Sequence, residues 1–142
     1  MTAAVVTILL IEDDKIDVMA MKRAFQELKI ANPLVVANDG VEALDMLRGT
    51  NGKQKVAHPY LVLLDLNMPR MDGFEFLSEL RQDPALSNAV TFVVTNSEAE
   101  DDRDRAYEKK IAGFIRKHEP GRSFVDAVAM FERYWKIVEF PA

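Results

Sequence analysis

The chain has 142 residues, of which 49% are hydrophobic and 29% are charged, and these proportions are typical of one globular domain with an ordinary core. Eighteen basic and 23 acidic residues give a net charge of -5, which argues against binding to the phosphate backbone of DNA or RNA. The sequence contains no cysteine and two histidines, which excludes disulfides, thiolate metal sites and a histidine-rich zinc cluster.

We expect no secretory leader or membrane anchor at the beginning of this sequence. The stretch MTAAVVTILLIEDD places no basic residue before its apolar run, whereas a secretory leader begins with a positively charged segment. The apolar run is also much shorter than the ~20 residues that a helix needs to cross a bilayer. We therefore expect a cytoplasmic protein that binds neither a membrane nor nucleic acid.

Five short apolar segments predict β-strands. The segment at 60–64 consists of apolar and aromatic residues that lead directly into Asp65. A segment that is apolar on both faces is typical of a central strand in a parallel sheet covered by helices on both sides. The other four predicted strands lie at 5–11, 34–37, 90–95 and 113–116.

Amphipathic segments between these strands predict helices. Residues 15–28 carry apolar residues at helical spacing, and Asp14 is a plausible N-cap. Asp39 and Glu42 form a capping-box pattern before a second helix. A third helix is expected from residue 74 to about residue 83, where the sequence reaches Asp-Pro.

The last two predicted helices differ in character. Ser97 and Glu100 form a second capping-box pattern, and the helix that follows, through about Lys109, is mostly charged. We expect that helix to be loosely held. The final helix, at about 123–139, has an apolar stripe that is wider than one face of a sheet requires.

The alternation of strands and helices predicts the fold class. Each predicted strand is followed by one helix, which gives five βα units. Right-handed crossovers then place helices on both faces of one parallel sheet. We expect an α/β protein with a doubly wound, five-stranded parallel sheet that forms a single domain over residues 1–142.

Polar side chains follow four of the predicted strands at their carboxyl ends. Glu12 and Asp13 follow the first strand, Asp65 the third, Thr95 ends the fourth, and Lys117 follows the fifth. If the strands are parallel, all of these residues meet at one edge of the sheet, where ligands bind in open α/β sheets.

This set of residues predicts chemistry on a phosphoryl group. Crowded carboxylates repel one another, and a bound cation relieves the repulsion. Oxygen ligands without histidine or cysteine suit Mg²⁺ or Mn²⁺. Lys117 supplies a point charge for a phosphate oxygen, and Thr95 supplies a hydroxyl. Asp65 is then the candidate nucleophile, forming an acyl phosphate.

With these residues in place, the chain resembles a response-regulator receiver domain of two-component signalling over essentially its whole length. The matching motifs are IEDD at 11–14, DLNMPRMDG at 65–73, Thr95 and GFIRK at 113–117. The resemblance implies a flavodoxin-like fold with strand order 2-1-3-4-5. It further implies Asp65 as the phosphoacceptor, Thr95 and Lys117 as phosphate contacts, and Mg²⁺ bound by Glu12, Asp13, Asp65 and the backbone carbonyl of Asn67.

The resemblance also implies a conformational switch. Phe114 stands three residues before Lys117, where the family carries an aromatic switch residue. Phosphorylation adds roughly -1.5 to -2 charge, so Thr95 is expected to turn toward the phosphoryl group and Phe114 to fill the vacated space. The alternative is that Phe114 is an ordinary core residue.

Two positions depart from the usual pattern of receivers. His118 follows Lys117 where receivers usually have proline, so we expect an altered loop at 118–122. Asn96 follows Thr95 where the family often has a smaller residue, and its side chain is expected to shield the phosphoryl group and change its lifetime.

The long loop before residue 60 and the tail FERYWKIVEFP give a finer resemblance, to single-domain regulators that work with cyanobacterial and bacterial phytochromes. The wide apolar stripe of the last helix favours a homodimer. Its contact is expected to involve the tail at 134–142 and the residues Phe131, Trp135, Val138 and Phe140.

We therefore expect a response regulator without an output domain that accepts a phosphoryl group from a sensor histidine kinase, with a phytochrome as the candidate kinase. It would act as an enzyme only on itself, through Mg²⁺-dependent phosphorylation and dephosphorylation. Two alternatives remain open at this point. One is a phosphohydrolase with an aspartyl nucleophile, although such enzymes usually have a second Asp where this chain has Asn67. The other is a phosphate-independent interaction module.

Overall fold

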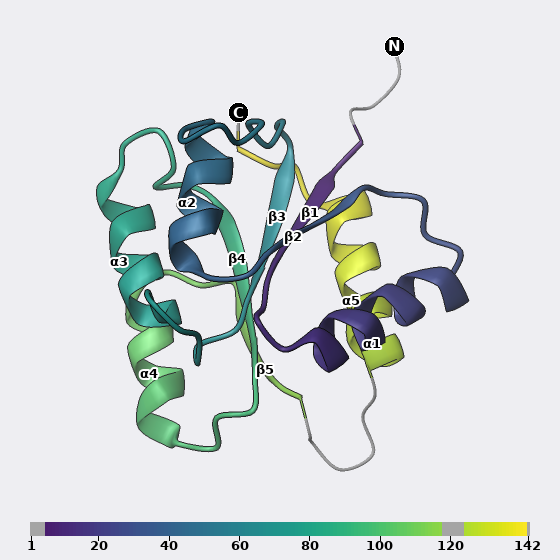
Figure 1. Ribbon diagram of the computed structural model, residues 1–142. Coiled ribbons are helices and arrows are strands. Elements are labelled where there is room, and N and C mark those ends of the chain that lie inside the picture. Colours follow the sequence, from purple (N-terminus) through teal and green to yellow (C-terminus); the bar gives the residue numbers. More distant parts are fainter. Residues whose placement is uncertain (1–4, 118–123, 142) are drawn as a thin grey trace.

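Five parallel strands form one sheet in the order β2-β1-β3-β4-β5 (Figure 1). The computed structural model describes residues 5–117 and 124–141. The predicted α/β fold and strand order are confirmed. The strands are β1 (Thr7–Ile11), β2 (Leu34–Ala37), β3 (Tyr60–Leu64), β4 (Val90–Thr95) and β5 (Gly113–Arg116). The helices are α1 (Lys15–Glu27), α2 (Gly40–Arg48), α3 (Gly73–Gln82), α4 (Glu100–Glu108) and α5 (Phe124–Ile137).

Helices cover both faces of the sheet. In Figure 1, α1 and α5 lie on one face and α2, α3 and α4 lie on the other. Successive residues of a strand point to opposite faces, so Leu61 and Leu63 of β3 pack with α1 and α5, whereas Val62 and Leu64 pack with α2 and α3. All five residues of β3 are buried, as expected for the central strand of a doubly wound sheet.

Three helices begin at aspartate caps. The side chains of Asp14, Asp39 and Asp72 each accept hydrogen bonds from backbone N–H groups in the first turn of α1, α2 and α3. The predicted capping box before α2 is half correct. Asp39 accepts from the Glu42 N–H at 2.9 Å, but Glu42 reaches back to the N–H of Asn38 at 3.3 Å instead of that of Asp39.

The capping box predicted at Ser97 is wrong. The N-cap of α4 is Ala99, which makes no side-chain cap hydrogen bond. Ser97 is instead held outside the helix, because its N–H donates to Thr95 Oγ1 at 3.3 Å and its carbonyl accepts from Arg116 at 3.3 Å. Its hydroxyl donates to Asp102. Within α4, Ala106 is the buried residue, which agrees with the expected loose packing of this helix.

Close packing at the start of α3 requires glycine at position 73. A Cβ added there would lie 2.7 Å from Leu66 Cα and 2.9 Å from the carbonyl oxygen of Asp65. The Gly73 N–H donates to the Leu66 carbonyl at 2.8 Å. This contact folds α3 back against the end of β3 and fixes the backbone next to Asp65.

Arg81, near the end of α3, connects three segments of the chain close to the start of β4. Its guanidinium donates to the carbonyls of Ser87 and Ala89, in the chain leading to β4, and to those of Lys109 and Lys110, just after α4. The four donor–acceptor distances lie between 2.7 and 2.9 Å. One side chain therefore satisfies four backbone acceptors that regular secondary structure leaves open.

The prediction that Phe131 and Trp135 form a dimer contact is wrong, because both are buried in the chain's own core. Their exposed fractions are 0% and 6%. The ring of Phe131 lies 5.0 Å from that of Phe92, and the ring of Trp135 lies 6.1 Å from that of Phe25. The apolar stripe of α5 is wide because this helix packs on both the sheet and α1.

The other two predicted interface residues lie nearer the surface. Val138 is 37% exposed. Phe140 is partly buried and packs edge-on against Tyr134 at 6.1 Å between ring centroids. Among the described residues, no helix combines the length and the apolar character that a membrane span requires.

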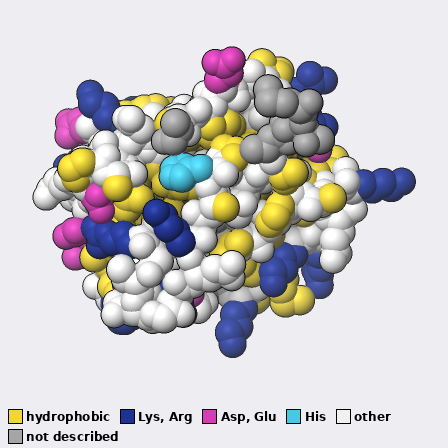
Figure 2. Space-filling view, turned by 90° about the horizontal axis from the view of Figure 1, so that it is seen from above, with side chains coloured by type: hydrophobic (Ala, Val, Ile, Leu, Met, Phe, Trp, Pro, Cys, Tyr) yellow, Lys and Arg dark blue, Asp and Glu magenta, His cyan; other side chains and the backbone are white. Residues whose placement is uncertain are grey.

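Different side chains lie at the two ends of the strands. Figure 2 looks down on the amino ends, where hydrophobic, basic and acidic side chains are interspersed. The predicted metal- and phosphate-binding residues lie at the opposite end of the strands. Glu12 and Asp13 follow β1, Asp65 follows β3, Thr95 ends β4 and Lys117 follows β5.

Candidate functional site

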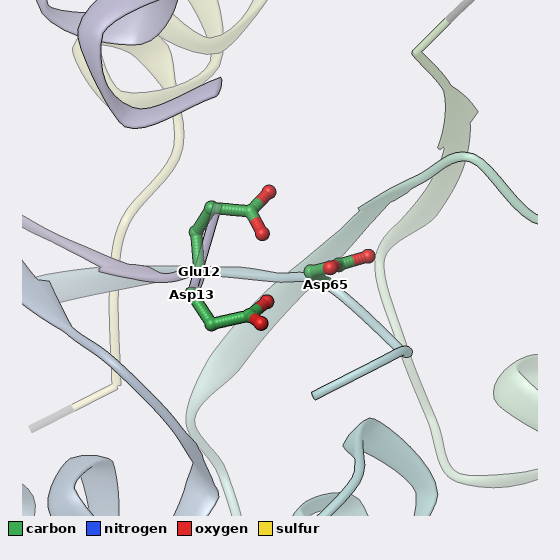
Figure 3. Close-up of side chains that lie close together, drawn as sticks. All are labelled: Glu12, Asp13 and Asp65. Carbon is green, nitrogen blue, oxygen red and sulfur yellow. The ribbon is translucent and has the colours of Figure 1, made fainter. Parts of the chain in front are cut away.

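Three carboxylates meet at the carboxyl ends of β1 and β3. One oxygen each from Glu12, Asp13 and Asp65 lies within 4.8 Å of the others, and Figure 3 shows the three side chains at these strand ends. Parallel pairing places Ile11 opposite Leu64, so both strands end at the same level. The Asp65 N–H donates to the Ile11 carbonyl at 3.0 Å, which extends the ladder up to the site.

The burial of the three carboxylates is unequal. Glu12 is 2% exposed and Asp65 is 7% exposed, whereas Asp13 is exposed to solvent. Buried carboxylates are costly unless cations or donors compensate them. The arrangement therefore needs a positive charge close by.

Lys117 supplies that charge from the end of β5. Its side chain is 2% exposed, and its Nζ donates hydrogen bonds to Glu12 Oε1 and, at 2.7 Å, to Asp17 Oδ2. Asp65 Oδ2 lies 3.9 Å from the same nitrogen, which allows ionic attraction but is too long for a hydrogen bond. The Lys117 N–H donates to the Thr95 carbonyl at 2.8 Å. This hydrogen bond fixes the backbone of Lys117 beside the end of β4.

The pKa values of this cluster reflect burial and pairing together. Burial and the nearby charge of Asp65 together raise the pKa of Glu12 to about 7, against the lowering effect of the hydrogen bond from Lys117. Burial opposes the charge on Lys117, but the hydrogen bonds to Asp17 and Glu12 outweigh it, so the pKa of Lys117 is raised. Lys117 is therefore an ammonium ion at neutral pH.

Thr95 and Phe114 lie on the two strands beyond β3. Thr95, at the end of β4, is fully buried, and its Oγ1 accepts from the Ser97 N–H at 3.3 Å. Phe114 pairs with Val93 across β4 and β5 and is partly buried against the core under α2, α3 and α4. The Arg116 guanidinium lies 5.6 Å from the ring centroid of Phe114.

The loop after Asp65 is anchored by a residue that the sequence reading missed. Arg70 has a left-handed backbone, with φ of 61°. Its guanidinium donates two hydrogen bonds to the Asp39 carboxylate, at 2.7 and 3.0 Å. Asn67 lies between Asp65 and this anchor and is exposed. The role of its carbonyl as a metal ligand stays a prediction.

Asp17 and Arg116 were also missed. Asp17 lies in the first turn of α1, three residues after the N-cap Asp14. This spacing was the available signal, because it places the Asp17 carboxylate at the start of the helix, near the end of β1. Arg116 donates to the carbonyls of Ser97 and Glu98 at 3.3 and 3.4 Å. No pattern in the sequence pointed to that contact. His118 and the loop that follows it lie outside the described residues.

The carboxylates fit a small divalent cation. Mg²⁺ binds oxygen at about 2.1 Å in octahedral geometry, which puts opposite ligands about 4.2 Å apart. Three oxygens within 4.8 Å of one another reach such an arrangement with small side-chain rotations. The donor set contains oxygen alone, as hard cations prefer.

Comparison with known proteins agrees with this geometry. The family model for the response regulator receiver domain matches residues 8–129. The chain belongs to the response-regulator receiver family. Response regulator Rcp1 of Synechocystis sp. strain PCC 6803 is 32% identical over 136 residues, which cover 95% of this receiver and 92% of Rcp1.

Solved structures give the same result. The phosphorylated cyanobacterial phytochrome response regulator RcpA has a TM-score of 0.87 and 31% identity, over 98% of this receiver and 100% of the RcpA chain. The Mn²⁺-bound form of Rcp1 has a TM-score of 0.84 and 32% identity, over 96% and 99% of the two chains. The acidic cluster of this receiver is thus of the kind that binds divalent metal ions, and receivers as a class interact with sensor histidine kinases.

Proposed function

We propose that Asp65 is the phosphoacceptor of this receiver and that a sensor histidine kinase is the donor. One observation supports this most directly: the ammonium of Lys117 lies 3.9 Å from Asp65 Oδ2, beside two further carboxylates that suit a divalent cation. A carboxylate nucleophile, a cation site and a buried ammonium are the groups that phosphoryl transfer requires.

The transfer step forms one bond and breaks one. An Asp65 carboxylate oxygen forms a bond to phosphorus while the bond from phosphorus to the kinase histidine breaks and its electron pair returns to the imidazole nitrogen. Hydrolysis later passes the phosphoryl group to water and restores the carboxylate. The receiver thus acts catalytically on itself and otherwise serves as a switch.

The surrounding residues neutralise and orient the phosphoryl group. Lys117 binds one of its oxygens, and the hydroxyl of Thr95 donates to another. Mg²⁺ or Mn²⁺, when bound by Glu12, Asp13, Asp65 and the carbonyl of Asn67, supplies further positive charge to the transferring oxygens.

The switch passes from Thr95 toward α4. When the Thr95 hydroxyl turns to the phosphoryl group, it gives up its contact with the Ser97 N–H, and Phe114 moves into the space that it leaves. The two long hydrogen bonds from Arg116 to the same loop, at 3.3 and 3.4 Å, hold the resting arrangement weakly enough to exchange.

The kinase is proposed to be a phytochrome and the compartment the cytoplasm. Support for the first comes from RcpA and from AtBRR, a bacteriophytochrome response regulator whose structure matches with a TM-score of 0.77 and 29% identity, over 98% of this receiver and 99% of the AtBRR chain. We also propose a homodimer. Since Phe131 and Trp135 are buried, its contact is assigned to the exposed apolar residues of the last helix and tail, Met130, Ile137 and Val138.

Phosphorylation in solution tests the proposal. Acetyl phosphate with Mg²⁺ should add one phosphoryl group per chain, measured by intact mass, and Asp65→Asn should take up none. Asp72→Asn is the matched control, because it changes a carboxylate in the same loop whose cap an amide can maintain. Equal labelling of Asp65→Asn and wild type would remove Asp65 as the acceptor.

A second experiment addresses the donor. The phosphorylated kinase core of a bacterial phytochrome should transfer its label to this receiver and leave Asp65→Asn unlabelled. Labelling by acetyl phosphate without transfer from such a kinase would keep the phosphoacceptor assignment and reject the phytochrome. Steady turnover of small phosphate esters would favour the phosphohydrolase instead.

A further inference from the structure

Asp17 competes with Asp65 for the ammonium of Lys117. The Lys117 Nζ donates to Asp17 Oδ2 at 2.7 Å, whereas Asp65 Oδ2 lies 3.9 Å away. Of these two aspartates, the closer one therefore lies outside the three-carboxylate cluster; within the cluster, Glu12 also accepts a hydrogen bond from the Lys117 Nζ. The side chain of Asp17 is 13% exposed and that of Lys117 is 2% exposed, so this ion pair is shielded from water and from screening by salt.

The start of α1 places Asp17 for this contact. Asp14 caps the helix through hydrogen bonds to Ile16 and Asp17 N–H groups, at 2.9 and 3.4 Å. Side chains in a helix tilt toward its N-terminus, so the carboxylate of Asp17 extends back toward the end of β1. There it contacts the ammonium of Lys117, whose side chain extends from the end of β5.

A cation bound in the three-carboxylate cluster would not neutralise Asp17, which would still attract the ammonium of Lys117. Glu12, Asp13 and Asp65 form the group that can share a divalent ion, and an ion there takes up negative charge that Lys117 otherwise neutralises. Asp17 does not belong to that group, so its attraction for Lys117 persists. It pulls the ammonium away from the position in which it would bind a phosphoryl oxygen.

We infer that Asp17 is a positioning residue that holds Lys117 back from Asp65 and thereby slows entry of the phosphoryl group. The inference rests on the proposed role of Asp65 as phosphoacceptor and adds a determinant of its rate. With Asp17 neutralised, Lys117 needs to move by roughly 1 Å to reach hydrogen-bonding distance from Asp65. A closer ammonium also attracts a dianionic phosphodonor more strongly.

Three variants test the inference by their phosphorylation rates with acetyl phosphate and Mg²⁺. Asp17→Asn should react three- to tenfold faster than wild type, and its affinity for beryllofluoride should rise by a similar factor. Asp14→Asn removes the same charge nearby, keeps a capping side chain and makes no contact with Lys117 Nζ, so it should stay within twofold of wild type. Asp17→Glu restores the carboxylate and should return the rate toward wild type.

A spectroscopic readout separates this inference from the proposed function. The ¹⁵N resonance of the Lys117 ammonium in the metal-free protein should shift in Asp17→Asn and stay in place in Asp14→Asn. A wild-type protein that takes up no phosphoryl group, with this shift present, would reject the phosphoacceptor role alone. Equal rates in Asp17→Asn and Asp14→Asn, or a slower Asp17→Asn, would overturn the restraint by Asp17.

Discussion

Arg70 and Asp39 are joined by two hydrogen bonds, at 2.7 and 3.0 Å, across 31 residues of sequence. The pair ties the loop that follows Asp65 to the first turn of α2, because Asp39 is also the N-cap of that helix. The guanidinium also lowers the pKa of Asp39 by its hydrogen bond, in spite of the opposing effect of burial. The position of the loop thus depends on a helix that carries none of the proposed site residues.

Replacing Arg70 should weaken cation binding. Arg70→Gln frees the loop that carries Asn67, so its carbonyl is less well placed, and we expect Mg²⁺ affinity to fall by up to about tenfold. Isothermal titration with Mg²⁺ measures the change. Arg48→Gln is the control, since it removes a similar pair with Asp83, at 3.0 Å, away from the site. Equal affinities in the two variants would show that the Arg70 anchor does not reach the metal site.

Lys117→Gln should separate cation binding from phosphoryl transfer. The ammonium neutralises Glu12 in the metal-free protein and therefore competes with a divalent ion, so Mg²⁺ affinity should stay the same or rise. The phosphorylation rate should fall roughly 100-fold, because a donor to the transferring oxygens is lost. Titration calorimetry and intact mass measure the two effects. If Mg²⁺ affinity and the phosphorylation rate both fell, Lys117 would be needed for the structure of the site.

The stability of the metal-free protein should depend on pH through Glu12. Burial raises the pKa of Glu12 to about 7 from an ordinary value of 4.5, so the folded state binds a proton more tightly than the unfolded state. This contribution to stability is full below about pH 4.5 and is lost as the pH rises through about 7. Urea unfolding in EDTA measures this effect. Between pH 5 and pH 8, the free energy of unfolding of wild type should fall by on the order of 1–3 kcal/mol relative to that of Glu12→Gln. A constant difference would contradict the raised pKa.

Gly73→Ala should destabilise the fold by about 1–3 kcal/mol, because its Cβ would meet backbone atoms of Leu66 and Asp65 that cannot move without shifting the site. Gly113→Ala is the comparison. Its Cβ would approach the ring of Phe92 at 3.0 Å, and a side chain can move more easily. Urea unfolding of both variants measures the difference, and a smaller loss for Gly73→Ala would contradict the packing argument.

A charge at Ile137 should dissociate the proposed homodimer. Ile137 is 75% exposed at the end of α5, so Ile137→Lys leaves the core intact and places a charge in the contact. Sedimentation equilibrium should show a shift toward monomer. Ile16→Lys is the control, at a residue of α1 that is 77% exposed. If wild type sediments as a monomer, or if both variants dissociate equally, the assignment to α5 is wrong.

The sequence was sufficient to predict the sheet and the place where the proposed site residues meet. Short apolar runs identified the strands, and the polar residues that end them had to meet because parallel strands end at one edge. Glu12, Asp13, Asp65 and Lys117 are accordingly found together. Boundaries were less certain: the first strand was expected from residue 5, but Val5 is 63% exposed and the strand begins at Thr7.

Long side chains account for most of what the sequence did not reveal. Arg70 and Asp39 are 31 residues apart, and Lys117 and Asp17 are 100 residues apart, and no local pattern shows which distant group a flexible charged side chain will reach. In α3, Phe74 is only partly buried, whereas Phe76 is fully buried. The ring of Phe74 instead lies against the Arg105 guanidinium of α4, at 3.8 Å.

The two ends of α4 are held differently. Two of the four Arg81 hydrogen bonds hold the carboxyl end of α4, through the carbonyls of Lys109 and Lys110, at 2.7 and 2.9 Å. Its amino end follows Ala99, which provides no side-chain cap, and is tied to the preceding loop by the Ser97 hydroxyl, which donates to Asp102. That loop is itself held by the longer hydrogen bonds from Arg116. A displacement that begins at Thr95 would reach α4 through Ser97 and Asp102, so the amino end of the helix, at Glu100, would move further than the end that Arg81 holds.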